Sequence, residues 1–147
     1  VSSAQIADHL TLTQTGNRAI IDWQSFNIAA GKAVAFVQPG ANAAVLNRVS
    51  EAGGLSQIYG SLQANGMVLL MNPNGVLFGN GANVNVGALI ATTGTVDSSR
   101  FVDEVNPGFV AISGATGTVR NQGQITAQNA GLVALVAPSV INEGQVM

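Results

Sequence analysis

Side chains that could carry out acid–base or metal chemistry are few in this sequence. The 147 residues include one histidine, His9, seven carboxylates and no cysteine. A zinc site ordinarily takes several His or Cys ligands, so His9 alone cannot build one. A serine–histidine–aspartate arrangement could use only His9 with Asp8 or Asp22, and no Gly-x-Ser-x-Gly turn accompanies them. We therefore predict no metal site and interpret His9 as a surface or capping residue.

The carboxylates are scattered along the chain, and only Asp103 and Glu104 are adjacent. Cleavage of polysaccharides needs carboxylates that converge on the substrate, whereas neighbouring residues of a strand face opposite sides. The glycine-rich stretch Gly79-Asn80-Gly81 lacks the following helix and lysine of a phosphate-binding loop. The sequence thus predicts no catalytic residues, no cofactor and no enzyme activity.

Composition narrows the class of protein further. Apolar residues make up 47% of the chain, but charged residues only 8%, against roughly 25% in an ordinary soluble domain. The net charge of −2 leaves no cationic surface for nucleic acid or anionic lipid. Cysteine is absent, which is compatible with any compartment. No apolar run approaches the roughly 18 residues that would span a membrane as a helix.

The segment 66–93, GMVLLMNPNGVLFGNGANVNVGALIATT, shows how the chain is built. The apolar run Met67–Met71 stops at Asn72-Pro73-Asn74-Gly75, and a second run, Val76–Phe78, follows at once. Asn, Pro and Gly at the first, second and fourth positions suit a type I turn. Strict alternation over Asn83–Val86 then predicts a strand with two different faces. Three short strands are therefore joined by tight corners.

Similar units recur along the chain. Apolar runs that begin at Val34, Val68 and Leu132 each come after a glycine corner, and a proline lies seven or eight residues after that glycine. Asn121–Ile125 is echoed 21 residues later by Asn142–Val146. Divergent units of about 20 to 35 residues, made of strands and corners, indicate a β-solenoid, and a β-sandwich is the alternative. Scarce hairpin signals and apolar runs without alternation favour parallel, buried strands.

We accordingly predict a parallel β-helix of about six or seven coils with about 21 residues each. Residues 94–109 hold four charged residues and turn signals, which indicates an excursion from the coil as a short helix or loop. The chain stops inside what looks like another repeat, so residues 1–147 are expected to be a single domain at the N-terminus of a longer protein. The side chains expected to point inward are those of Val34, Phe36, Val68, Leu70, Val84, Val86, Leu89, Val133 and Leu135.

The octapeptide NPNGVLFG, Asn72–Gly79, resembles the motif of the two-partner secretion domain of filamentous-haemagglutinin-type exoproteins (the haemagglutination activity domain family). The approach Ser56–Gly66 and the exit Gly81–Thr93 are similar to those of the family as well. The resemblance extends from about Ala4 to the C-terminus. An upstream Asn-Pro-Asn-Leu motif, present in some members, is missing here, which favours an adhesin-like branch.

The resemblance implies a right-handed parallel β-helix with short extra-helical strands or loops, secreted by Gram-negative bacteria. It implies a secretion-addressing domain recognised by an outer-membrane β-barrel transporter with periplasmic POTRA domains, which it reaches by transit through the periplasm before folding at the cell surface. Asn72, Pro73, Asn74 and Gly75 would form the recognition tag or a corner that the coil needs, flanked by Val76, Leu77, Phe78 and Gly79.

Two alternatives remain open at this point. One is an adhesive module, a virulence factor that binds host glycans or receptors directly through its Asn- and Gln-rich surface. The other is a polysaccharide-active β-helix enzyme, which the scattered carboxylates disfavour. Export of an attached passenger would separate an addressing domain from an adhesive one.

Overall fold

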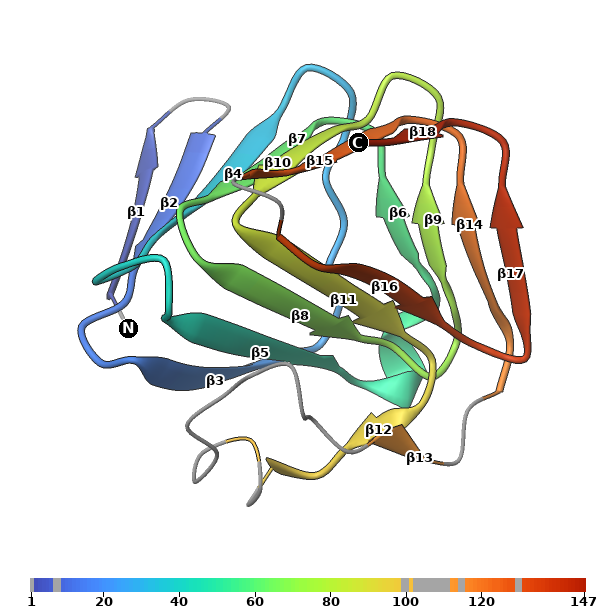
Figure 1. Ribbon diagram of the computed structural model, residues 1–147, viewed down its shortest axis with the longest axis horizontal. Coiled ribbons are helices and arrows are strands. Elements are labelled where there is room, and N and C mark those ends of the chain that lie inside the picture. Colours follow the sequence, from blue (N-terminus) through green and yellow to red (C-terminus); the bar gives the residue numbers. More distant parts are fainter. Residues whose placement is uncertain (1, 7–8, 99–100, 102–111, 114–115, 129–130) are drawn as a thin grey trace.

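Short strands turn in one direction around a common core and stack as successive coils (Figure 1). The computed structural model describes the chain except residues 1, 7–8, 99–100, 102–111, 114–115 and 129–130, and the side chains of 2–6 and 112–113. Three sheets, A, B and C, form the sides of the coil. Within them every pair of neighbouring strands is parallel, apart from the antiparallel pair β1–β2 at one edge. The predicted fold class, an all-β parallel β-helix, is confirmed.

The strands of each sheet follow one another in chain order. Sheet A contains β1 (Ser2–Ile6), β2 (His9–Thr13), β4 (Ala33–Val37), β7 (Ser61–Ala64), β10 (Asn83–Val86), β15 (Gln124–Ala127) and β18 (Gln145–Val146). Sheet B contains β3 (Arg18–Trp23), β5 (Ala44–Val49), β8 (Met67–Met71), β11 (Ala88–Thr92) and β16 (Val133–Val136). Sheet C contains β6 (Ser56–Ile58), β9 (Val76–Phe78), β14 (Thr118–Asn121) and β17 (Ser139–Asn142). A 3₁₀ turn, η1 (Glu51–Gly53), precedes β6, and β12 (Thr95–Val96) pairs with β13 (Ile112–Ser113) in a separate antiparallel sheet.

The register between coils confirms the predicted repeat of about 21 residues where the coil is regular. Asn121 pairs with Asn142, 21 positions later, and Ala88 pairs with Met67, again 21 positions apart. Elsewhere the coils are longer: Ser61 pairs with Ala33, 28 positions earlier, and Gln124 with Asn83, 41 positions earlier. The prediction of six or seven coils was therefore wrong. The molecule has about five, because the longer coils use up part of the chain.

The core lies inside the coil and is formed by the inward side chains of all three sheets. Seven of the nine predicted inward residues are buried there, and Val133 and Leu135 of the last coil pack against it half-buried. The alternation predicted for β10 is present, since Asn83 and Asn85 are exposed and Val84 and Val86 are buried. The sequence pattern therefore identified the correct face of the strand.

A second apolar cluster covers the outer face of sheet B. Leu46, Leu69 and Ile90 point away from the core, and Val96 and Phe101 pack over them. This explains why the run Met67–Met71 shows no alternation: β8 is buried on both faces. Residues 99–100 and 102–109 of the predicted excursion lie outside the described residues. Strand β12, near the start of the excursion, pairs with β13, just beyond its predicted end, outside the three coil sheets. The bounds 94–109 stay a prediction.

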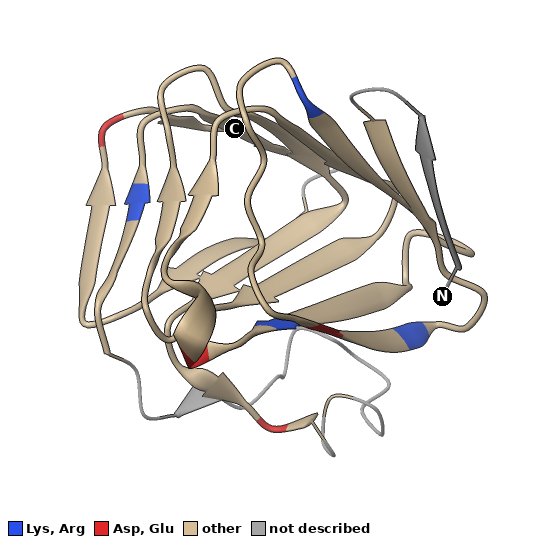
Figure 2. Cartoon of the chain, turned by 180° about the vertical axis from the view of Figure 1, so that it is seen from behind, with Lys and Arg blue, Asp and Glu red and all other residues tan. Residues whose placement is uncertain are grey.

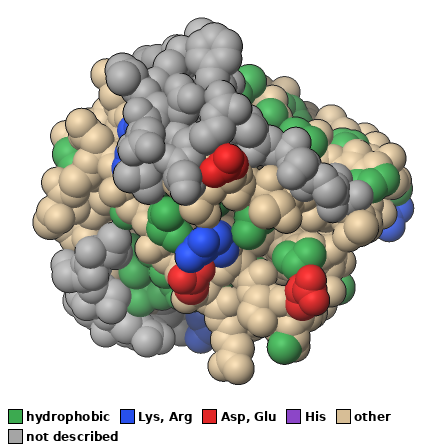
Figure 3. Space-filling view, turned by 90° about the horizontal axis from the view of Figure 1, so that it is seen from below, with side chains coloured by type: hydrophobic (Ala, Val, Ile, Leu, Met, Phe, Trp, Pro, Cys, Tyr) green, Lys and Arg blue, Asp and Glu red, His purple; other side chains and the backbone are tan. Residues whose placement is uncertain are grey.

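Charged residues are sparse, and in the described part of the chain the basic and acidic positions are distributed over several separate strands and turns (Figure 2). The underside of the molecule shows a few side chains of both signs among polar and apolar ones (Figure 3). The described part of the chain has no helix long and apolar enough to cross a membrane.

Close contact between coils at the corners gives a first prediction. Gly60 is buried between β6 and β7, and a Cβ there would lie 2.2 Å from the carbonyl oxygen of Lys32. We expect Gly60→Ala to lower the free energy of unfolding by about 1–3 kcal/mol, because the backbone must shift to admit the methyl group. Chemical denaturation of the purified domain measures this change.

Gly40→Ala is the matched control, since a Cβ at Gly40 meets nothing within 4 Å. It should leave stability unchanged or raise it by about 0.4–1 kcal/mol, through the reduced entropy of the unfolded chain. Equal destabilisation by the two substitutions would contradict the proposed role of the close corner.

Candidate functional site: the Asn72–Gly75 corner

The motif residues 72–75 form a tight turn between β8 and β9, as the sequence predicts. The Gly75 N–H donates to the carbonyl oxygen of Asn72 at 3.1 Å, which closes the turn. The Asn74 N–H donates to the Asn72 Oδ1 at 2.9 Å, so the side chain of the first residue supports the same turn. Gly75 is buried with φ of +120°, a conformation that side-chain-bearing residues rarely adopt.

Asn72 connects three successive coils. Its side chain is fully buried, and Nδ2 donates to the carbonyl oxygen of Gly54 at 2.9 Å and to the hydroxyl of Ser56 at 3.0 Å on the preceding coil. Its backbone N–H donates to the carbonyl oxygen of Thr92 on the following coil at 3.0 Å. Every polar atom of Asn72 is therefore engaged inside the molecule.

The other motif residues divide between surface and core. Asn74 is exposed, and its Nδ2 donates to the carbonyl oxygen of Glu51 at 2.6 Å. Pro73 is half-buried, and its carbonyl oxygen accepts a hydrogen bond from the Thr116 hydroxyl at 3.3 Å. Only Pro73 and Asn74 of the corner thus present part of their surface to solvent.

The flank residues 76–79 anchor the corner in the coil. Val76 and Phe78 are buried in the core, whereas Leu77 is half-buried on the other face of β9. At Gly79 an added Cβ would lie 2.1 Å from the ring of Tyr59, so the aromatic ring covers this glycine. The structure therefore brings all eight motif residues together as one folded segment.

The sequence analysis missed the partners of the corner. Gly54 and η1 were not singled out, and Ser56 was named only as the first residue of the approach to the motif. Ser56 lies 20 positions, about one coil, before its paired residue Val76. That spacing was the available signal. Stacking the motif on the preceding coil would have placed Ser56 beside Asn72.

Some of the ionisable groups form ion pairs along the coil. Arg48 donates to both carboxylate oxygens of Asp22, at 2.6 and 2.9 Å, and to the hydroxyl of Ser98 at 3.0 Å. The hydrogen bond from Arg48 lowers the pKa of the Asp22 carboxyl, and the same bond raises the pKa of the Arg48 guanidinium. Arg120 pairs with Glu143 at 2.5 Å. Among the described residues no three His, Cys, Asp or Glu side chains gather as metal ligands, and His9 is exposed.

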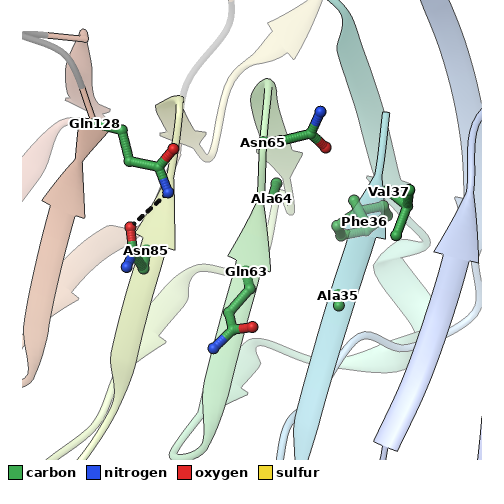
Figure 4. A pocket seen from close by; sticks show the side chains of 8 residues that line it. All are labelled: Ala35, Phe36, Val37, Gln63, Ala64, Asn65, Asn85 and Gln128. Atoms are coloured by element: carbon green, nitrogen blue, oxygen red, sulfur yellow. Dashed lines mark hydrogen bonds between the residues drawn. The ribbon is translucent and has the colours of Figure 1, made fainter. Parts of the chain in front are cut away.

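A shallow groove of about 480 Å³ lies on the outer face of sheet A (Figure 4). The side chain of Gln128 reaches that of Asn85 and donates to its Oδ1 at 2.9 Å. All the lining residues are uncharged, and half carry amides: Ala35, Phe36, Val37, Gln63, Ala64, Asn65, Asn85 and Gln128. The groove suits a neutral ligand with hydroxyl groups more than a charged one.

Fold and site together define a β-helical domain whose motif forms a hydrogen-bonded turn between β8 and β9. The chain matches the TPS (two-partner) secretion domain family over residues 4–147, and it belongs to that family. This is a family of secretion domains of exoproteins, not an enzyme family, and its exoproteins are secreted across the outer membrane.

Several proteins of Haemophilus influenzae resemble the chain. A heme/hemopexin-binding protein is 40% identical over 150 residues, covering 96% of this chain and 16% of that protein. Another heme/hemopexin-binding protein is 51% identical over 87 residues, covering 59% of this chain and 9% of its own length. The crystal structure of the HMW1 secretion domain matches with a TM-score of 0.85 and 30% identity, over 99% of this chain and 38% of that one. The chain thus spans about a sixth of the length of the first relative.

The burial of Asn72 predicts how substitutions in the corner rank. Asn72→Ala leaves the Gly54 carbonyl and the Ser56 hydroxyl without their buried partner, which should lower the free energy of unfolding by about 2–3 kcal/mol. Asn74→Ala is the control, because Asn74 is exposed; it should lower the free energy of unfolding by about 1 kcal/mol or less. Pro73→Ala removes only the φ angle that proline presets, so it should lower the free energy of unfolding by about 0.4–1 kcal/mol. Urea unfolding of the three variants measures the ranking, and an Asn72→Ala domain as stable as the unsubstituted one would refute it.

Proposed function

We propose that the chain is a secretion-addressing domain that an outer-membrane β-barrel transporter with periplasmic POTRA domains recognises. The observation that carries the proposal is the match to the TPS secretion domain family over residues 4–147. In this proposal the chain crosses the periplasm unfolded, passes through the barrel and folds at the cell surface. The absence of cysteine supports it, because no disulfide can lock the chain before it is threaded.

We further propose that the domain nucleates folding of the β-helix. The strands β16, β17 and β18 each lie at one edge of their sheet, with unpaired backbone groups along that edge. The last coil also exposes large apolar side chains, among them Leu132, Val140 and Val146. A further coil placed on this end would pair the strands and cover the side chains, so the folded domain can act as a template.

Export of a passenger tests the addressing function. We expect the chain, fused ahead of a reporter and co-expressed with its matching transporter, to reach the medium, and to remain in the periplasm when the transporter is omitted. Equal release with and without the transporter would refute the proposal. Asn74→Ala is the informative variant. If it abolishes export while the free energy of unfolding is unchanged, the exposed part of the corner is a recognition tag for the transporter.

The amide-lined groove favours a second candidate function, the adhesive module that binds a glycan or receptor on a host cell. Gln63 and Asn85 lie on adjacent strands in register, and their amides can both donate to and accept from sugar hydroxyls. If the groove binds neutral oligosaccharides, Gln63→Ala or Asn85→Ala should weaken binding by about tenfold, the loss of roughly one or two hydrogen bonds.

Binding to immobilised neutral oligosaccharides measures this effect. Gln57→Ala is the control, because Gln57 is exposed on β6 of sheet C, away from this groove. Binding unaffected by Gln63→Ala and Asn85→Ala would remove the adhesive function from this groove and leave the addressing function untouched.

A further inference from the structure

Three Asn-Gly pairs occur in the sequence: Asn65-Gly66, Asn74-Gly75 and Asn80-Gly81. Such pairs are chemically labile, since glycine offers no side chain to hinder its own backbone nitrogen. That nitrogen, once it has lost its proton to hydroxide, attacks the Cγ of the preceding asparagine. A new C–N bond forms, the carboxamide C–N bond breaks and ammonia leaves. Water then opens the resulting succinimide at either carbonyl, giving aspartate or isoaspartate, without any change of oxidation state.

The fold restrains both reacting groups at the first pair. The Gly66 N–H donates to the Gln38 Oε1 at 2.8 Å in a buried position. The Asn65 amide is held at both ends: its Oδ1 accepts from the Gln38 N–H and its Nδ2 donates to the Gln38 carbonyl oxygen, each at 2.8 Å. The nitrogen cannot approach the Cγ while these bonds persist.

The second pair is restrained in a similar way by the motif corner. The Gly75 N–H is bonded to the carbonyl oxygen of Asn72, and the side chain of Asn74 is fixed on the carbonyl oxygen of Glu51. Gly75 itself is buried. Both reacting groups are therefore engaged, as at the first pair.

The third pair lacks these restraints. Asn80 and Gly81 are the central residues of the exposed turn between β9 and β10, which the Ala82 N–H closes by donating to the carbonyl oxygen of Gly79 at 3.0 Å. Within the described part of the chain, neither the Asn80 side chain nor the Gly81 N–H makes a hydrogen bond. Both residues are exposed, and no hydrogen bond keeps the Asn80 side chain from turning toward the Gly81 nitrogen.

We propose that Asn80-Gly81 is a site of spontaneous deamidation in the folded domain, and that the fold suppresses the same reaction at Asn65 and Asn74. The product places a carboxylate beside a groove of about 370 Å³ that Asn80 and Gly81 line together with uncharged residues of the same segment and of the next coils. It adds one negative charge to a chain whose net charge is −2. The proposal is independent of the secretion function.

Peptide mapping by mass spectrometry tests the proposal. The folded domain is incubated at mildly alkaline pH, with a parallel sample in denaturant, and the loss of each asparagine is followed. In denaturant all three pairs should react at similar rates. In the folded domain Asn80 should react near its denatured rate, whereas Asn65 and Asn74 should be slower by about tenfold or more, because their bonds must first open locally.

Two controls accompany the measurement. Asn83 is exposed but followed by Val84, whose branched side chain hinders attack, so its loss should stay slow in both samples. Asn80→Gln should abolish the early acidic species seen on ion exchange. Equal rates at the three Asn-Gly pairs of the folded domain, or protection of Asn80 as strong as that of Asn74, would overturn the proposal.

Discussion

The structure depends on backbone hydrogen bonding between coils that lie one strand spacing apart, about 4.8 Å. This spacing fixes what each corner can contain, because a corner residue lies directly against its counterpart in the next coil. A Cβ at Gly144 would lie 2.1 Å from the carbonyl oxygen of Gly123, and one at Gly123 would lie 2.6 Å from that of Ala82. Glycine at these positions follows from the close approach of the coils, independently of any binding or catalytic role.

Corners also interrupt the ladder of backbone bonds, and buried amide side chains replace the missing partners. Gln38 links the coil before it to the coil after it, since its Nε2 donates to the Gln14 Oε1 at 3.2 Å and to the Met67 carbonyl oxygen at 3.1 Å. Asn47 lies inside strand β5 and not at a corner, and it also links coils: it accepts from the Trp23 indole at 2.9 Å and donates to the Leu69 carbonyl oxygen at 3.1 Å. Buried polar groups are costly when unpaired, so these amides restrict which coil can follow which. Asn72 is the member of this set that lies in the motif.

Most of the fold could be predicted from the sequence, because period-two alternation at Asn83–Val86 and the 21-residue echo at Asn121 and Asn142 are local signals of a coil. The number of coils could not be predicted, because the lengths of the corner insertions leave no periodic trace. The packing of Val96 and Phe101 over Leu69 could not be predicted either, because these residues meet only through tertiary structure. At the site, turn chemistry identified the corner. Its connection to Ser56 depends on a register that no single segment encodes.

The burial of Asn72 limits which motif residues a partner protein can contact. In the folded domain its amide is hydrogen-bonded to Gly54 and Ser56. Of the corner residues, only Pro73 and Asn74 are accessible to solvent. A partner that contacts Asn72 directly must therefore do so before the coil closes, when the amide still faces water. A partner that meets the folded domain can contact only the outer half of the turn. If the proposed transporter binds Asn72 during transit, folding ends that contact, because the same amide then becomes a buried structural link between coils.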